Sequence, residues 1–182
     1  MLNLTPKEVF LTRGKGIHKF KLSSFEEALR NAGMADQNIV SVSSIIPPQC
    51  KIIPKKRGLA KISPGSIRHA VVARIETDEH NRQIAASVGI ALPKDSDKWG
   101  YISEVHEYGL TRLECGDLAE DIAASMLGTT LGIEIDPDKA WIEKEQFYKA
   151  SGLIVHTDSI TQTAVGKSGY WTTAVAMAVF IL

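Results

Sequence analysis

Residues 38–54 read NIVSVSSIIPPQCKIIP, a strand-like stretch with two adjacent serines in it. Its β-branched residues at alternating positions predict one strand, because such side chains suit a pleated backbone. Successive strand residues point to opposite faces, which places Ser44 between Val42 and Ile46 on an aliphatic face. A hydroxyl in that position needs a hydrogen-bond partner or a chemical role. The prolines at residues 47–48 lack amide hydrogens, so the strand is expected to end just after the serines.

The composition indicates one globular domain of 182 residues. Lys and Arg together number 21 and Asp and Glu number 21, so no basic surplus points to nucleic acid or a membrane surface. The apolar run at residues 174–182 is too short to span a bilayer, and residues 1–10 lack the pattern of a secretory signal. We therefore expect a cytoplasmic protein in which Cys50 and Cys115 are free thiols.

The rest of the chain predicts more strands than helices. Apolar and β-branched runs predict strands at residues 9–12, 68–77, 83–92, 99–105 and 170–182. The first is expected to stop at the glycines of residues 14–16. The second and third are expected to form a hairpin through residues 78–81. The last is expected to be a buried central strand, because so apolar a segment must be covered. Residues 141–147 and 152–155 give weaker signals.

Two segments predict amphipathic helices. The first begins at residues 23–24, where a serine can cap it, carries Glu26 in its first turn and ends at Gly33. The second spans residues 117–130 and is expected to face the core with Leu118, Ile122, Met126 and Leu127. The order of elements predicts an α+β fold of mostly antiparallel sheets with helices outside. No glycine-rich phosphate loop is present, so nucleotide binding is not expected.

Two adjacent serines at a strand end permit a particular chemistry. The hydroxyl of Ser44 can attack the carbonyl carbon of Ser43, provided that a donor stabilises the developing oxyanion and that the backbone is strained. Asn38, at the start of the strand, is a candidate donor. The simpler alternative is a serine that bonds a nearby carbonyl. A serine hydrolase is disfavoured, because Ser44 has no nucleophile-elbow context and no evident histidine partner.

Several segments carry a resemblance to a known family in the same order along nearly the whole chain. They are SSFEEALRNAG, NIVSVSSIIPP, IAASVGIALPKD, WGYISE and the apolar C-terminal strand. In these segments the sequence resembles the pyruvoyl-dependent arginine decarboxylases. The most specific part is the serine pair, followed by two prolines and preceded by Asn38, together with the downstream Glu104.

The resemblance implies a self-processing enzyme with the layered αββα sandwich of that family. The single domain would cut itself between Ser43 and Ser44 into a small subunit, residues 1–43, and a large subunit, residues 44–182. Ser44 would become a covalent pyruvoyl group, which replaces pyridoxal phosphate, and no metal is implied. The family assembles as trimers with active sites between protomers, so a trimer or hexamer is expected here.

The resemblance also implies the reaction, which converts arginine to agmatine and carbon dioxide through an imine with the pyruvoyl group. Glu104 matches the general acid that protonates Cα. His106 shares its strand face and is expected to be a surface histidine. Glu104, His106 and Glu107 on one short strand cannot close a tetrahedral metal site, so no metal is expected.

The resemblance implies that Ser43 and Leu29 bind the substrate. It also implies substrate contacts at Glu26, Ala35 and Gln37, three residues that differ from those usual in the family. Glu26 stands where the family has Asp, and its carboxylate would hold the substrate guanidinium. This difference leaves open the same chemistry on another amino acid. A further alternative is an unprocessed homologue that serves as a structural or regulatory trimer subunit.

Overall fold

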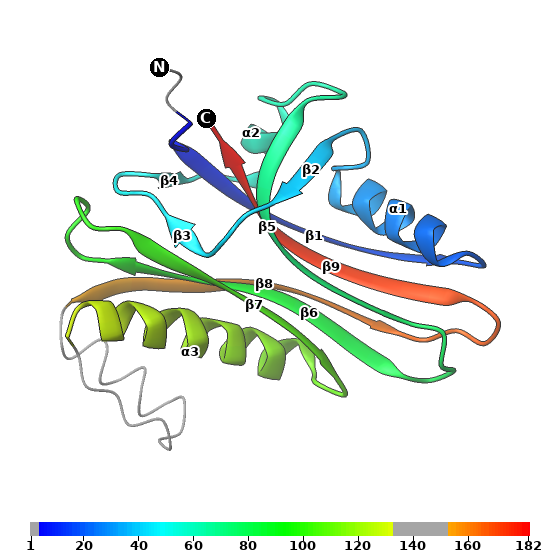
Figure 1. The fold of residues 1–182 in the computed structure, drawn as a ribbon. Coiled ribbons are helices and arrows are strands. Elements are labelled where there is room, and N and C mark those ends of the chain that lie inside the picture. The colour runs from blue at the N-terminus through cyan, green and yellow to red at the C-terminus, as the bar shows by residue number, and fades with distance from the viewer. Residues whose placement is uncertain (1–3, 133–152) are drawn as a thin grey trace.

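The structure is a computed structural model that describes residues 4–132 and 153–182. Two β-sheets dominate it, one of five strands in the order β2-β5-β9-β1-β4 and one of four strands in the order β3-β7-β6-β8 (Figure 1). The strands are β1 Glu8–His18, β2 Asn38–Ser41, β3 Ile45–Ile46, β4 Lys51–Ile52, β5 Ile67–Thr77, β6 Gln83–Pro93, β7 Gly100–Tyr108, β8 Ile154–Val165 and β9 Trp171–Ile181. The helices described are α1 Lys21–Ala32, α2 Lys55–Leu59 and α3 Arg112–Thr130.

Most neighbouring strands run antiparallel, which confirms the predicted α+β class. β9 pairs antiparallel with both β1 and β5, and β6 pairs antiparallel with both β7 and β8. Among the described strands, only the two short edge strands pair in parallel, β2 with β5 and β4 with β1. No helix in the described residues is long and apolar enough to cross a membrane.

Three apolar layers hold the elements together. The first lies between the sheets, where Val71, Val88 and Ile102 are fully buried. The second joins α1 to the opposite face of the five-stranded sheet. The third joins α3 to the opposite face of the four-stranded sheet. Figure 1 shows α1 and α3 on the two outer sides, with both sheets between them.

The predicted central strand is confirmed. β9 lies between β5 and β1, and all of its residues from Thr172 to Ile181 are buried. Residues 141–147 lie outside the described residues. The weak signal at residues 152–155 overlaps the beginning of β8, which starts at Ile154.

The prediction that β1 stops at residues 14–16 is wrong, because β1 continues to His18. The glycines instead leave room for the backbone of α1. A Cβ atom on Gly14 would lie 2.1 Å from the Ala28 carbonyl oxygen, and one on Gly16 would lie 2.1 Å from the Ser24 carbonyl oxygen. These positions face α1, so glycine lets the helix backbone approach the strand closely.

The predicted hairpin between β5 and β6 is also wrong, because the two strands belong to different sheets. Their connection carries the chain from one sheet to the other. It is held by the connection that follows β8, where Asn81 N donates to the Gly166 oxygen at 2.9 Å. The alternation of apolar residues cannot show whether two successive strands pair with each other or belong to different sheets, because both arrangements bury the same kind of side chain.

The first helix begins at Lys21, before the predicted serine cap, so Glu26 lies beyond the first turn. Ser24 is buried within the helix, and its hydroxyl lies 2.7 Å from the Thr173 hydroxyl of β9. The predicted end is confirmed, because Gly33 has φ of 81° and its amide closes the helix.

The second predicted helix, α3, begins five residues early because Thr111 and Glu114 form a capping box. Its predicted core face is largely wrong. Leu118 and Ile122 are 38% and 37% exposed, whereas the buried side consists mainly of small residues. A Cβ atom on Gly89 of β6 would lie 2.3 Å from the Ala119 carbonyl oxygen. The helix therefore packs so close to the sheet that larger side chains, Leu127 excepted, turn outward.

We predict that Gly14→Ala lowers the midpoint of thermal unfolding by roughly 5–10 °C, because the new methyl group would clash with the backbone of α1. Circular dichroism melts measure this directly. Lys15→Ala is the matched control, since that neighbouring side chain is exposed and should tolerate truncation. Equal melting points for the two variants would contradict the close approach of α1.

Candidate active site

The Ser43–Ser44 peptide bond lies where the chain crosses between the two sheets. β2 ends at Ser41 on the edge of the five-stranded sheet, and β3 begins at Ile45 on the edge of the other sheet. Figure 1 shows this crossing as the cyan ribbon between β2 and β3. The prediction of one continuous strand is therefore wrong. The predicted stop is confirmed, because β3 ends at Ile46 before the two prolines.

Backbone hydrogen bonds fix both ends of the crossing. Val42 N donates to the Ala70 oxygen of β5 at 3.0 Å, and Ile102 N of β7 donates to the Ser44 oxygen at 2.7 Å. Between them, Ile45 N donates to the Ser43 oxygen at 3.1 Å, which closes a three-residue turn centred on Ser44. The Ser43 carbonyl therefore already has a donor on its oxygen.

The Ser44 side chain is half-buried at this turn. Val42 and Ile46 do pack in the core between the sheets, as predicted for that face. The strand is interrupted between them, however, so alternation does not fix the direction of the Ser44 side chain. Its hydroxyl makes no hydrogen bond to any residue that the structure describes. The simpler alternative of a serine bonded to a nearby carbonyl therefore finds no support among those residues.

Glu104 lies on β7, two residues after Ile102, the residue that binds the Ser44 carbonyl. Both therefore belong to the same face of β7, and Ile102 points into the core between the sheets. Glu104 is exposed in the single chain, as is His106. No group of three His, Cys, Asp or Glu residues within the described ranges could hold a metal ion.

The amides of Gln37 and Asn38 hold a neighbouring loop in place. Asn38 Nδ2 donates to the Gly65 oxygen at 2.8 Å. Gln37 is buried, and its side chain donates to the Ser63 oxygen at 3.1 Å and accepts from the Ser66 hydroxyl at 2.8 Å. These bonds tie residues 63–66 to the start of β2. Within one chain, neither amide contacts the Ser43 carbonyl.

The remaining predicted substrate residues lie on α1, which covers the other side of the five-stranded sheet, or just after it. Glu26 forms an ion pair with Arg30 on the exposed side of α1, and Leu29 packs between α1 and the sheet. Ala35 is exposed just after that helix. The structure brings Ser43 and Ser44 to the edge of β7, the strand that carries Glu104. It does not bring Glu26, Leu29 or Ala35 to them within one chain.

A cavity of about 210 Å³ opens beside Ser43. It is lined by Leu4, Pro6, Val42, Ser43, Ile45, Pro47, His69 and Phe180. Sequence reasoning missed His69, because it stands in an ordinary strand with no motif around it. Its one signal was a titratable side chain on the strand face that also carries Val71, Ala73 and Ile75.

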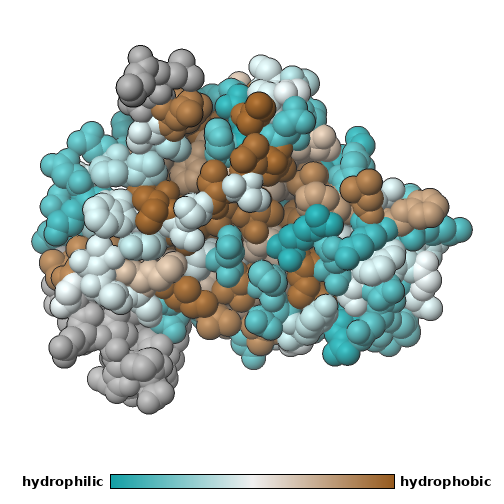
Figure 2. All heavy atoms as spheres, viewed as in Figure 1, coloured by the Kyte–Doolittle hydropathy of each residue, from teal (hydrophilic) through white to brown (hydrophobic). Residues whose placement is uncertain are grey.

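Apolar residues surround this cavity at the surface. Leu4, Val40, Ile45 and Ile67 are all exposed, and we call them the apolar edge. Figure 2 shows apolar side chains gathered where β2, β3 and β5 reach the surface. Exposed apolar clusters of this kind mark interaction sites.

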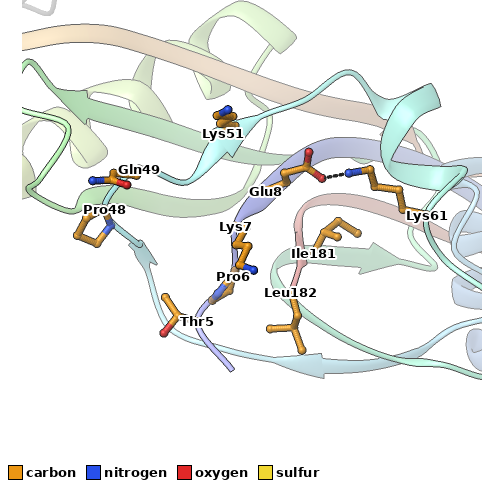
Figure 3. A pocket seen from close by; sticks show the side chains of 10 residues that line it. All are labelled: Thr5, Pro6, Lys7, Glu8, Pro48, Gln49, Lys51, Lys61, Ile181 and Leu182. Carbon is orange, nitrogen blue, oxygen red and sulfur yellow. Dashed lines mark hydrogen bonds and ion pairs between the residues drawn. The ribbon is translucent and has the colours of Figure 1, made fainter. Parts of the chain in front are cut away.

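A larger cavity of about 520 Å³ also borders the N-terminal segment and shares Pro6 with the first. Figure 3 shows Lys61 directed at the carboxylate of Glu8 in this cavity. This hydrogen bond from Lys61 is the main reason why the pKa of Glu8 lies below its ordinary value. None of the predicted site residues lines this larger cavity.

Comparison with known proteins decides the family. The family model for pyruvoyl-dependent arginine decarboxylases matches residues 8–182. The chain belongs to this family. Among curated members, the chain is 51% identical over 179 residues to pyruvoyl-dependent arginine decarboxylase 2 of Methanosarcina mazei, covering 98% of each protein. It is 52% identical over 183 residues to the pyruvoyl-dependent arginine decarboxylase of Nitrosopumilus maritimus, covering all of both. A probable family member from Chlorobium limicola is 52% identical over 180 residues, covering 99% of each.

The family predicted from sequence is thereby confirmed. The cofactor of the family is a pyruvoyl group, as its name states. The roles of the individual residues in this chain stay predictions, and the geometry described above is what supports them.

Proposed function

We propose that this chain is a self-processing decarboxylase that converts arginine to agmatine and carbon dioxide with a pyruvoyl group made from Ser44. The observation that carries the proposal is the Ser43–Ser44 bond itself. It lies in a tight turn between two sheets, and an amide donates to the Ser43 carbonyl. Curated relatives that match almost the whole chain are named pyruvoyl-dependent arginine decarboxylases.

Self-cleavage begins when the Ser44 hydroxyl oxygen attacks the carbonyl carbon of Ser43. Negative charge then develops on the Ser43 oxygen, where the Ile45 amide already donates at 3.1 Å. A donor aimed at that oxygen lowers the barrier to attack. Asn38 contributes by fixing the start of β2 through its bond to Gly65. The products are residues 1–43 and residues 44–182.

We predict that the purified protein contains two fragments, residues 1–43 and 44–182, and that Ser44→Ala leaves one uncut chain that releases no carbon dioxide from arginine. The alanine has no hydroxyl to attack the preceding carbonyl. Denaturing gels and intact mass spectrometry measure the cut, and labelled arginine measures the release. Ser41→Ala, three residues earlier, is the control and should be cut normally. A wild-type chain that stays whole would instead favour the unprocessed trimer subunit.

The residues around Ser44 fit a pyruvoyl group made in place, because Ser44 is half-buried and its backbone is held by β7. The group supplies an electron sink for the electrons left on Cα when carbon dioxide departs. Glu104 delivers a proton to Cα, from the β7 face that also carries Ile102. Removing the exposed Glu104 carboxyl from bulk water requires cover that the described residues of one chain do not provide.

We predict that Glu104→Gln is cut normally but decarboxylates arginine at least roughly 10²-fold more slowly, because the amide cannot deliver a proton. Steady-state kinetics on the cut protein measures kcat, and a gel measures the cut. Glu107→Gln, exposed on the same strand, is the control and should keep normal turnover. Normal turnover in Glu104→Gln would remove Glu104 from the mechanism.

We further propose that a second protomer completes the site, in a trimer or a hexamer built from trimers. The apolar edge beside Ser43 gives such a partner an apolar surface to cover. Glu26 and Leu29 lie on α1, across the five-stranded sheet from Ser44, so they can serve Ser44 only on a neighbouring protomer, and we propose the same for Ala35, which follows α1. The helix, sheet, sheet, helix order of packing supports the layered αββα sandwich of the family.

Glu26 of the neighbouring protomer is proposed to hold the substrate guanidinium. In the single chain its carboxylate already pairs with the guanidinium of Arg30. The Arg30 and Glu26 side chains are 71% and 45% exposed, and such surface pairs contribute little free energy. A substrate guanidinium can therefore displace Arg30 at small cost. Gln37 and Ser43 are proposed to line the same pocket.

We predict that arginine is decarboxylated faster than lysine or ornithine, and that Glu26→Ala raises KM for arginine by roughly 10–100-fold through loss of a charge-assisted bond. A panel of amino acids measures the preference. Arg30→Ala is the matched control, because it removes the competing guanidinium and should leave KM unchanged or lower it. Preference for ornithine or lysine would show that glutamate at this position has changed the substrate.

A further inference from the structure

The cavity beside Ser43 contains an ionisable group that the proposed mechanism has not used. Of its eight lining residues, all in the described part of the chain, six are apolar and one is Ser43. The eighth is His69, the single titratable side chain among them. The cavity thus places an imidazole beside the residue whose carbonyl is attacked, in surroundings that are otherwise apolar.

The register of β5 explains why His69 points this way. His69 pairs with Val40 of β2, just before the crossing begins. It precedes Val71 by two residues, and Val71 points into the core between the sheets. His69 therefore shares that inward face and lies beneath the crossing. Its imidazole is half-buried and makes no hydrogen bond to any residue in the described ranges.

We propose that His69 is the acid–base group of self-cleavage, an inference that rests on the proposed function. A serine hydroxyl is a weak nucleophile unless a base takes its proton. His69 accepts the proton of the Ser44 hydroxyl as that oxygen bonds to the Ser43 carbonyl carbon. When the carbon–nitrogen bond breaks, His69 returns the proton to the departing nitrogen of Ser44. An ester joins the two serines at this stage, and the imidazole carries no net gain or loss of a proton.

The ester then loses the Ser44 α-proton and the Ser43 carboxylate, which leaves dehydroalanine. Addition of water and loss of ammonia give the pyruvoyl group. His69 is assigned only the first of these steps, the transfer of the Ser43 acyl group from nitrogen to oxygen. This assignment separates it from Glu104, which lies on β7 and does not line the cavity.

The test follows the cut over time in full-length chains made by cell-free synthesis, with samples quenched at intervals. We expect His69→Gln to be cut roughly 10²-fold more slowly than the wild-type chain. Its uncut chain should resist hydroxylamine, which cleaves esters, because the block precedes the ester. His80→Gln is the matched control on the exposed turn after β5 and should be cut at the wild-type rate.

A second variant guards against simple misfolding. His69→Ala enlarges the apolar cavity, and added imidazole should restore its cutting in proportion to concentration. Cutting of His69→Gln at the wild-type rate would overturn the inference, as would uncut chain that hydroxylamine cleaves between the serines. Failure of imidazole to restore His69→Ala, when circular dichroism shows it folded, would also overturn it. If the wild-type chain itself stays whole, the proposed function fails first.

Discussion

The crossing from β2 to β3 is the constraint on which the candidate site depends. Two hydrogen bonds, from Val42 to Ala70 and from Ile102 to Ser44, attach its ends to different sheets. The sheets are in turn held apart at a fixed distance by the side chains between them. The three linking residues must span this gap, and the chain closes a tight turn at Ser44 to do so. The position of the reactive bond thus follows from how two sheets pack.

Small residues set the spacing of the outer layers. Gly14 and Gly16 let α1 approach the five-stranded sheet closely, and Gly89 lets α3 approach the four-stranded sheet. With no side chain at these points, the helix backbones themselves rest on the strands. The sheets are thereby covered tightly on their outer faces, which gives the central core its rigid boundaries.

The sequence predicted those features whose signal is local. Gly33 ends α1 because the left-handed conformation there suits glycine, and the two prolines end β3 because they lack amide hydrogens. The family was also predicted, since its motifs are contiguous. Gly14 and Gly16 were misjudged because the reason for them, the approach of α1, lies elsewhere in the chain. The core face of α3 and the position of His69 depend on packing between distant segments in the same way.

The placement of β1 has a consequence for what the proposed cut does to the molecule. β1 pairs along its full length with β9 and, at its start, with β4, so it is an interior strand. It belongs to the small fragment, whereas both of its neighbours belong to the large one. Cutting after residue 43 therefore leaves two chains interleaved in one sheet. Folding is then unimolecular before the cut, but reassembly of the separated fragments would be a bimolecular reaction that depends on their concentration. Formation of the mature protein therefore depends on the chain folding first and being cut second.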